Sequence, residues 1–206
     1  MRVLCDDQRS EEWLACRRGK ITASSIQRVL AGPETRSRNS YMMSLVFDLE
    51  GVPDFNDEEP GVWFEDGRKY ESWARGWYSW NYNVDVSETG FVLHDEFDWI
   101  GCSPDGIVEP DGLIEIKYRK SLKTYDQHTK RIQPSAFNQM QMQMYVMDRA
   151  WCDYVNYWRN DDNEEKGHVQ RVQRDDERLE LLIEKCHAFW ADVNTLFASR
   201  AAGAST

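Results

Sequence analysis

The spacing of apolar residues changes along this chain, and that change limits the folds open to it more than any other feature. Helical three-to-four spacing gives way in mid-chain to short segments rich in β-branched and aromatic residues, separated by turn residues. The pattern predicts helices over 10–18, 22–31, 40–50, 62–80 and 134–147, and a final helix whose apolar residues run from Leu179 to Phe197. It predicts strands over 83–87, 91–95, 98–102, 113–118, 151–158 and 168–174.

These elements indicate an α/β fold with a central mixed β-sheet flanked by helices. The strands between residues 83 and 118 are expected to lie in one sheet. Neither a repeat nor a low-complexity linker interrupts the sequence, and 206 residues are enough for one substantial core. We therefore expect a single domain over residues 1–206.

One predicted hairpin, "GCSPDGIVEPDGLIEIKYRK" at 101–120, carries an unusual set of charges. Successive side chains of a strand point to opposite faces, so Glu115 and Lys117 share one face of "LIEIK" and the two isoleucines share the other. The turn "EPDG" at 109–112 can return Asp105 to a position beside Glu115. A core strand needs the isoleucines, but it has little need of a carboxylate and an ammonium group on its other face.

The chemistry of Asp105, Glu115 and Lys117 indicates a phosphodiester-hydrolysing site. Two converging carboxylates repel each other, and a hard divalent cation such as Mg²⁺ relieves that repulsion. A nearby lysine can orient or deprotonate a water on the cation, which completes a set of Lewis acid, nucleophile and base. The alternative is a plain salt bridge between Lys117 and one of the carboxylates, without a catalytic role.

The charge of the chain is unevenly distributed. A formal net charge of −11 disfavours nucleic-acid binding, which usually requires a basic surface. Residues 16–38, however, hold a net charge of +5 and residues 115–131 hold +4, which leaves −20 on the rest of the chain. These two basic segments could line a DNA-facing surface, or they could be ordinary solvated faces.

Cysteine and histidine spacing argues against several other classes of protein. The five cysteines form neither a CxxC pair nor a zinc-type pattern, and the four histidines are scattered, so we expect reduced thiols and no histidine-based metal site. No apolar run reaches about 18 residues, and the N-terminus lacks the apolar core of a secretory signal. A cytoplasmic protein is the expectation from these features.

Five short motifs occur in an order and at spacings that resemble a known family. They are "CRRGKITASSI" (16–26), "GRKYE" (67–71), "GCSPDG" (101–106), "LIEIK" (113–117) and "QMQMQMYV" (139–146). Each motif is weak alone, but together the chain resembles the phage lambda-type alkaline exonucleases, viral recombinases of the PD-(D/E)xK nuclease superfamily. The resemblance implies a restriction-endonuclease-like core.

The resemblance also implies roles for the residues of the hairpin. Asp105 and Glu115 would bind Mg²⁺, or Mn²⁺ in its place, and the Ile116 carbonyl would be a further ligand. Lys117 would act on the attacking water. Glu71 would complete the acidic cluster through a water or a second metal ion.

A glutamine from the last motif is expected in the site, and its identity is open. Gln139 matches the active-site glutamine of the family, whereas the superfamily pattern Q-x-x-x-Y fits Gln141 and Tyr145. On a helix, Gln139 and Gln143 lie about 40° apart on one face and Gln141 lies on the other side. A separate apolar stripe is expected in the core: Met140, Met144 and Met147.

Arg17 and Ser24 match the family positions that hold the terminal 5′-phosphate of DNA. An arginine offers a bidentate fork to phosphate, and Ser24 lies near a predicted helix start, where free N–H groups attract anions. Arg18 is a rival for Arg17. The tryptophans at helical spacing are expected in the core or in subunit contacts rather than as base-stacking surfaces: Trp13, Trp63, Trp73, Trp77 and Trp80.

Taken together, the resemblance implies a Mg²⁺-dependent, processive 5′→3′ exonuclease that acts on double-stranded DNA ends. It would release 5′-mononucleotides and leave 3′ overhangs for phage recombination in the host cytoplasm. Family members form ring-shaped homotrimers around DNA and work with a phage single-strand annealing protein. The alternatives are a PD-(D/E)xK nuclease of other polarity, a structure-specific endonuclease, and a non-catalytic scaffold that binds DNA ends.

Overall fold

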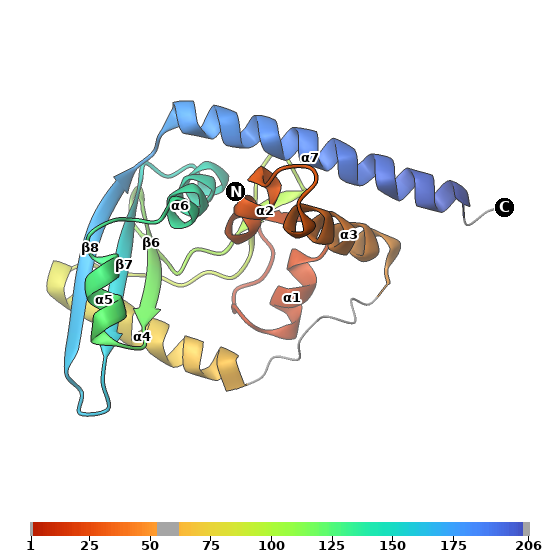
Figure 1. Ribbon diagram of the computed structural model, residues 1–206. Coiled ribbons are helices and arrows are strands. Elements are labelled where there is room, and N and C mark those ends of the chain that lie inside the picture. Colours follow the sequence, from red (N-terminus) through yellow and green to blue (C-terminus); the bar gives the residue numbers. More distant parts are fainter. Residues whose placement is uncertain (1, 53–61, 204–206) are drawn as a thin grey trace.

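The computed structural model describes residues 2–52 and 62–203, and in the second range the side chains from Lys69 onward. Figure 1 shows how the helices surround the sheets. The helices are α1 (Glu11–Arg17), the 3₁₀ turn η1 (Ala23–Ser25), α2 (Ile26–Leu30), α3 (Arg36–Glu50), α4 (Val62–Tyr82), α5 (Leu122–His128), α6 (Pro134–Met147) and α7 (Asp176–Gly203). The strands are β1 (Arg2–Val3), β2 (Ile21–Thr22), β3 (Val92–Leu93), β4 (Ile100–Cys102), β5 (Gly106–Val108), β6 (Gly112–Arg119), β7 (Trp151–Arg159) and β8 (Glu165–Gln173).

The strands of the described residues form two sheets. A small sheet has the order β1-β3-β4-β2, and a larger one has the order β5-β6-β7-β8. The larger sheet is mixed, because β6 runs parallel to β7 while β5 and β8 are antiparallel to their neighbours. This mixed sheet with helices around it confirms the predicted fold class.

The two faces of the β5–β8 sheet, here called the α4 face and the α6 face, are covered by different helices (Figure 1). Side chains alternate between the faces along each strand. The α4 face packs isoleucines and aromatic residues against α4: Ile114, Ile116, Val155 and Tyr157 with Ala74 and Tyr78. The α6 face contributes Leu113, Cys152 and Tyr154 to the main core.

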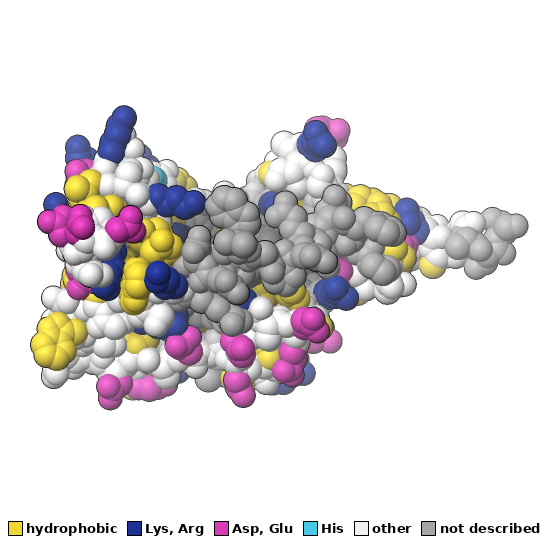
Figure 2. Space-filling view, turned by 90° about the horizontal axis from the view of Figure 1, so that it is seen from below, with side chains coloured by type: hydrophobic (Ala, Val, Ile, Leu, Met, Phe, Trp, Pro, Cys, Tyr) yellow, Lys and Arg dark blue, Asp and Glu magenta, His cyan; other side chains and the backbone are white. Residues whose placement is uncertain are grey.

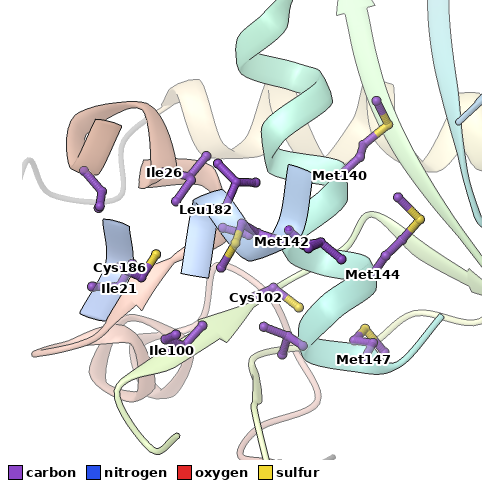
Figure 3. Packing of buried hydrophobic residues seen from close by; sticks show 14 of the residues in the cluster. Ile21, Ile26, Ile100, Cys102, Met140, Met142, Met144, Met147, Leu182 and Cys186 are labelled. Carbon is purple, nitrogen blue, oxygen red and sulfur yellow. The ribbon is translucent and has the colours of Figure 1, made fainter. Parts of the chain in front are cut away.

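Helix α6 packs into the main core through its buried methionines. It begins with Pro134 in its first turn and ends at Asp148, whose backbone is left-handed with φ of 50°. Its methionines Met140, Met142, Met144 and Met147 are buried among Ile21, Ile26, Ile100, Cys102, Leu182 and Cys186 (Figure 3). The predicted methionine stripe in the core is therefore confirmed. Because these contacts fix the rotation of α6 about its axis, they decide which of its glutamines faces the sheet.

Some predicted elements differ from the structure. The prediction that the strands between residues 83 and 118 form one sheet is wrong, because the chain passes from the small sheet to the larger one at 103–105. Within 83–87, which the structure describes, Ser87 alone pairs, forming a bridge with Ile107. The helix predicted over 22–31 is split, with Thr22 in β2 before η1 and α2. Strand β5 and helix α5 were not predicted.

The surface agrees with an uneven charge distribution. Acidic side chains are frequent along the lower edge of the face shown in Figure 2, while lysines and arginines are spread over the rest of that face. Trp80 is 87% exposed, so the core position is wrong for it and a subunit contact stays a prediction. Trp63 lies outside the described side chains. In the part of the chain that is described, no helix has both the length and the hydropathy needed to cross a membrane.

Candidate active site

The β5–β6 hairpin brings Asp105 and Glu115, here called the acid pair, to one end of the larger sheet. Gly106 pairs with Ile114, so Asp105 lies level with Glu115. The Asp105 carboxylate accepts a hydrogen bond of 2.6 Å from the N–H of Ile116. Glu115 is 1% exposed. The return of Asp105 to a position beside Glu115, predicted from the turn, is confirmed.

Lys117 reaches Glu115 from the more open side of the site. Its Nζ lies 2.5 Å from Glu115 Oε1, and its side chain is 35% exposed. This ion pair by itself is also what the alternative of a plain salt bridge predicts. The alternative does not account for Asp105, a second carboxylate in the same place.

The electrostatics of the acid pair indicate a place prepared for a positive charge. The pKa of Asp105 is raised well above its usual value, first by burial and then by the negative charges of Glu115 and Glu71. The pKa of Lys117 is raised as well, chiefly by the charge of Glu115, which outweighs the opposing effect of burial. The one ammonium group therefore stays protonated and does not fully compensate the carboxylates.

Gln143 of α6 is the glutamine that contacts the acid pair. Its Nε2 donates a 2.7 Å hydrogen bond to Glu115 Oε2. Its Oε1 is buried and has no hydrogen-bond partner among the described residues. Gln139, which matches the family's glutamine, lies one turn earlier on the same face and is half-buried, so the residue that touches Glu115 is one turn further along than that match.

The alternative glutamine, Gln141, has a structural role, because its side chain hydrogen-bonds to the backbone. Its Nε2 donates to the carbonyl of Gln173 at 2.9 Å, and its Oε1 accepts from the N–H of Asp175 at 2.8 Å. Tyr145, its partner in the Q-x-x-x-Y pattern, stacks on His94 with the ring centroids 4.5 Å apart. Neither residue makes a described contact with the acid pair.

Glu71 lies on the other side of Asp105, on α4. It forms an ion pair with Arg9, a residue that was not predicted from the sequence to lie in the site. Its charge still reaches the site, since it contributes to the raised pKa of Asp105. Arg75, one turn after Glu71, donates to the carbonyl of Asp105 at 3.1 Å and pairs with Glu88. The positions of Arg9 and Arg75 depend on contacts between distant segments, and no local pattern marks them.

Arg17 is connected through Trp13 to the loop that carries Asp105. Its guanidinium stacks over the Trp13 ring at 4.1 Å, and Trp13 Nε1 donates to Ser103 Oγ at 2.8 Å. Burial lowers the pKa of Arg17, and no carboxylate pairs with it in the described part of the chain. The neighbouring Arg18 is exposed. A half-buried guanidinium without a carboxylate is suited to an anionic ligand.

Ser24 lies in η1. A network of hydroxyl groups separates it from Arg17. Its Oγ is 3.2 Å from Thr22 Oγ1, and Thr22 N–H donates to Tyr41 OH at 3.3 Å. Tyr41 in turn lies close enough to Arg17 for their charges to interact. The structure thus connects the two residues through Thr22 and Tyr41, without a direct contact.

The acid pair has a donor set that fits Mg²⁺. Among the described residues, no three His, Cys, Asp or Glu side chains form a complete metal cage. Mg²⁺ is commonly bound by one or two carboxylates, while water and substrate phosphate complete its octahedron. The raised pKa of Asp105 and the unpartnered Gln143 Oε1 both mark a place where a cation and its water fit.

A polar group on β7 extends the site beyond the predicted residues. Tyr154 and Asn156 lie beside Glu115 and Lys117 in the β6–β7 register. Both contact Arg119, with distances of 2.7 Å from Arg119 Nη2 to Tyr154 OH and from Arg119 Nε to Asn156 Oδ1. Period-two spacing of polar residues in "DYVNYW" is the signal that could have indicated them.

Comparisons with known proteins agree with this geometry. The YqaJ-like viral recombinase domain matches residues 12–150. The alkaline exonuclease LHK-Exo from Laribacter hongkongensis superposes with a TM-score of 0.80 and 32% identity, over 95% of this chain and 98% of that one. A structure of LHK-Exo in complex with dAMP gives 0.82 and 30% with the same coverage.

Two more distant proteins extend the comparison. A phage-related exonuclease from Haemophilus somnus shares the fold, with a TM-score of 0.69, 16% identity, and 88% and 96% of the two chains covered. The uncharacterised protein R354 of Acanthamoeba polyphaga mimivirus is 28% identical over 167 residues, which span 72% of this chain but 29% of that protein. The chain therefore belongs to the YqaJ-like viral recombinase family, with the PD-(D/E)xK fold of the alkaline exonucleases, and this homology supports a nuclease that acts on DNA.

Proposed function

We propose that this chain is a Mg²⁺-dependent exonuclease that enters double-stranded DNA at an end and degrades the 5′-ended strand. It would release 5′-mononucleotides and leave 3′ overhangs for phage recombination in the host cytoplasm. The acid pair carries the proposal, because two carboxylates converge in a buried place with Lys117 and Gln143 against one of them. A relative, LHK-Exo, has been crystallised with the mononucleotide dAMP, which supports the same product class.

The residues of the site have separate tasks in the proposed reaction. When bound, Mg²⁺ supplies a Lewis acid for the phosphate and lowers the pKa of a coordinated water; Mn²⁺ would substitute for it. Asp105 and Glu115 would hold the ion together with the Ile116 carbonyl. The N–H and C=O of a strand residue point to the same side, so that carbonyl faces the edge where Ile116 N–H meets Asp105. A second ion near Glu71 would require the Arg9 pair to open.

Lys117 and Gln143 would position the attacking water. Since Glu115 keeps Lys117 protonated, Lys117 would donate a hydrogen bond and offset the negative charge that develops on the phosphate. Gln143 Oε1, which lacks a partner in the described residues, would accept a hydrogen bond from the water. Gln139, one turn earlier on the same face, would lie further out along the strand of DNA.

Arg17 supports the choice of the 5′ end. Its guanidinium is fixed over Trp13, which is bonded to Ser103 two residues before Asp105. A terminal 5′-phosphate held by Arg17, and by Ser24 from the other side of Thr22 and Tyr41, would place the first phosphodiester over the acid pair. The same residues would then select a 5′-phosphorylated end over a hydroxyl end.

The assembly around the DNA is a further part of the proposal. The single nuclease domain would form a ring-shaped homotrimer, with the basic segments toward a central channel and the acidic remainder outward. Such a ring would keep hold of the DNA between cuts and so make the enzyme processive. A phage single-strand annealing protein would receive the 3′ overhang.

The test is the degradation of a linear duplex labelled at its 5′ or 3′ ends, with and without 5′-phosphate, in Mg²⁺ or in EDTA. We expect the 5′ label to leave as mononucleotide in Mg²⁺ only. Degradation in EDTA would refute the two-carboxylate mechanism, and loss of the 3′ label first would show the opposite polarity. Nicking of circular duplex would identify an endonuclease, and binding without cleavage would identify a scaffold.

The polarity assignment is tested by Arg17→Ala, with Arg18→Ala as its matched control. Arg17→Ala should reduce the preference for 5′-phosphorylated ends, whereas Arg18→Ala should preserve it. An equal loss of rate on phosphorylated and unphosphorylated ends would contradict the role of Arg17.

A further inference from the structure

Arg119 lies on the same face of β6 as Glu115 and Lys117, because side chains of a strand repeat every second residue. Its Nε donates to Asn156 Oδ1 and its Nη2 donates to Tyr154 OH, both at 2.7 Å. In the β6–β7 register Tyr154 pairs with Glu115 and Asn156 pairs with Lys117. The guanidinium therefore points back along the sheet toward the acid pair rather than out to solvent.

The two residues that hold Arg119 are themselves fixed. Asn156 is 0% exposed and Tyr154 is 2% exposed. Asn156 Nδ2 donates to the carbonyl of Tyr125 in α5 at 3.2 Å, so the amide is oriented from both sides. Burial raises the pKa of Tyr154, which keeps its phenol neutral. Arg119 is thus held in one place by two fixed neutral side chains, those of Tyr154 and Asn156.

The charge of Arg119 is not compensated within the described residues. Arg171, on the opposite face of the sheet, is paired through two hydrogen bonds with the carboxylate of Asp153. The charge of Lys117 is balanced by its ion pair with Glu115. Arg119 has no ion pair with any described carboxylate, and its Nη1 has no hydrogen bond there. A fixed, half-buried guanidinium with a free donor is a site for an anion.

We propose that Arg119 binds a phosphate of the DNA strand adjacent to the phosphate that is cut, and so fixes the strand over the acid pair. This inference rests on the proposed nuclease function and adds a substrate contact to it. Residues two apart on a strand are separated by roughly 6.6 Å. Lys117 and Arg119 leave the same face of β6 at that backbone spacing, and the guanidinium of Arg119 turns toward the acid pair, so the two cations can contact neighbouring phosphates of one strand.

The experiment compares Arg119→Ala and Arg119→Lys with Lys185→Ala, which removes an exposed charge from α7, outside the two basic segments. Arg119→Ala should raise KM for linear duplex about 10- to 100-fold, with a smaller change in kcat. It should also lower the slope of log Kd against log salt concentration by about one. Arg119→Lys should give a smaller rise in KM, because lysine keeps the charge but loses the fork. Lys185→Ala should leave KM and the salt slope unchanged.

A KM and salt slope for Arg119→Ala equal to those of Lys185→Ala would overturn the proposal. Thermal unfolding of each variant shows whether it is folded, and if Arg119→Ala is not, Arg119→Lys decides by the same readouts. Tyr154→Phe, which releases Nη2 and keeps the charge, should raise KM less, and its effect should not add to that of Arg119→Ala. If the effects of Tyr154→Phe and Arg119→Ala on KM were fully additive, the role of Tyr154 in holding Arg119 would be contradicted.

Failure of the nuclease function can be told apart from failure of this inference. Absence of cleavage by the wild type in Mg²⁺ would refute the proposed function. Duplex binding in EDTA, measured by fluorescence anisotropy, still tests Arg119 by itself. Equal Kd values and salt slopes for wild type and Arg119→Ala in that assay would overturn the phosphate contact.

Discussion

The two faces of the β5–β8 sheet each bury a carboxylate beside a basic residue and a tyrosine, but they complete these groups differently. On the α4 face, Asp153 accepts two hydrogen bonds from Arg171, at 2.8 and 2.9 Å, and one from Tyr78 OH at 2.6 Å. Asp153 is 2% exposed, and both of its oxygens are occupied by donors. A buried carboxylate whose charge is balanced by its own guanidinium in this way is a structural ion pair that needs no further cation.

On the α6 face the groups are left incomplete. Asp105 and Glu115 share one ammonium group, from Lys117, and burial, followed by their mutual repulsion, raises the pKa of Asp105. Gln143 Oε1 and the charge of Arg119 are without partners in the described residues. The difference teaches that a buried charged group indicates function only when its pairing is incomplete, since both faces contain the same kinds of residues.

The largest expected effect comes from removing one carboxylate of the α6 face. Asp105→Asn should lower the rate of duplex degradation by at least about 1,000-fold, because a metal ligand and its charge are lost. Its unfolding free energy should stay the same or rise, since the repulsion within the acid pair is relieved. Initial rates in Mg²⁺ and urea unfolding measure the two effects. A variant that is destabilised but as active as wild type would reverse the roles of the two faces.

The matching change on the α4 face should affect stability and spare catalysis. Asp153→Ala should lower the free energy of unfolding by about 2–4 kcal/mol, because Tyr78 OH loses its acceptor and Arg171 loses its partner. The rate per folded molecule should be unchanged. Urea unfolding, with activity normalised to the folded fraction, checks this prediction. A loss of rate without a loss of stability would show that the α4 face also serves the reaction.

The two glutamines of α6 provide a third contrast. Gln143→Leu should lower the cleavage rate about 10- to 100-fold at nearly constant stability, since it removes a group that orients Glu115. Gln141→Leu should instead lower the melting temperature, because the carbonyl of Gln173 and the N–H of Asp175 lose their partner. The cleavage rates and melting temperatures of both variants test this contrast. Equal loss of rate in both would mean that α6 acts through its packing and not through Gln143.

The smallest expected effect is a pH dependence of the α4 face. The folded pKa of Tyr78 is raised, first by burial and then by its hydrogen bond to Asp153, above an unfolded value of about 10. Its contribution to stability is therefore complete below about pH 10 and declines as the pH rises past that value. Tyr78→Phe should cost about 1 kcal/mol at pH 8, and this cost should shrink above pH 10. A cost that is constant from pH 8 to 11 would contradict the assignment.

The hairpin and α6 could be predicted from sequence because their signals are local. The turn at 109–112 and the alternation in "LIEIK" lie within one short segment, and Pro134 marks the start of α6. The division into two sheets could not be predicted, because it depends on which strand pairs with β4 and β6. The choice of Gln143 over Gln139 was also beyond the sequence, since the two lie one turn apart on the same face and tertiary packing sets the position of α6 along the sheet.

Binding of Mn²⁺ without DNA, followed by titration calorimetry, tests most directly whether the incomplete face is the site. Wild type and Tyr78→Phe, which alters the completed face, should bind Mn²⁺ with the same affinity. Asp105→Asn, although folded, should show no binding heat over the same range. Equal Mn²⁺ binding by wild type and Asp105→Asn would contradict the account.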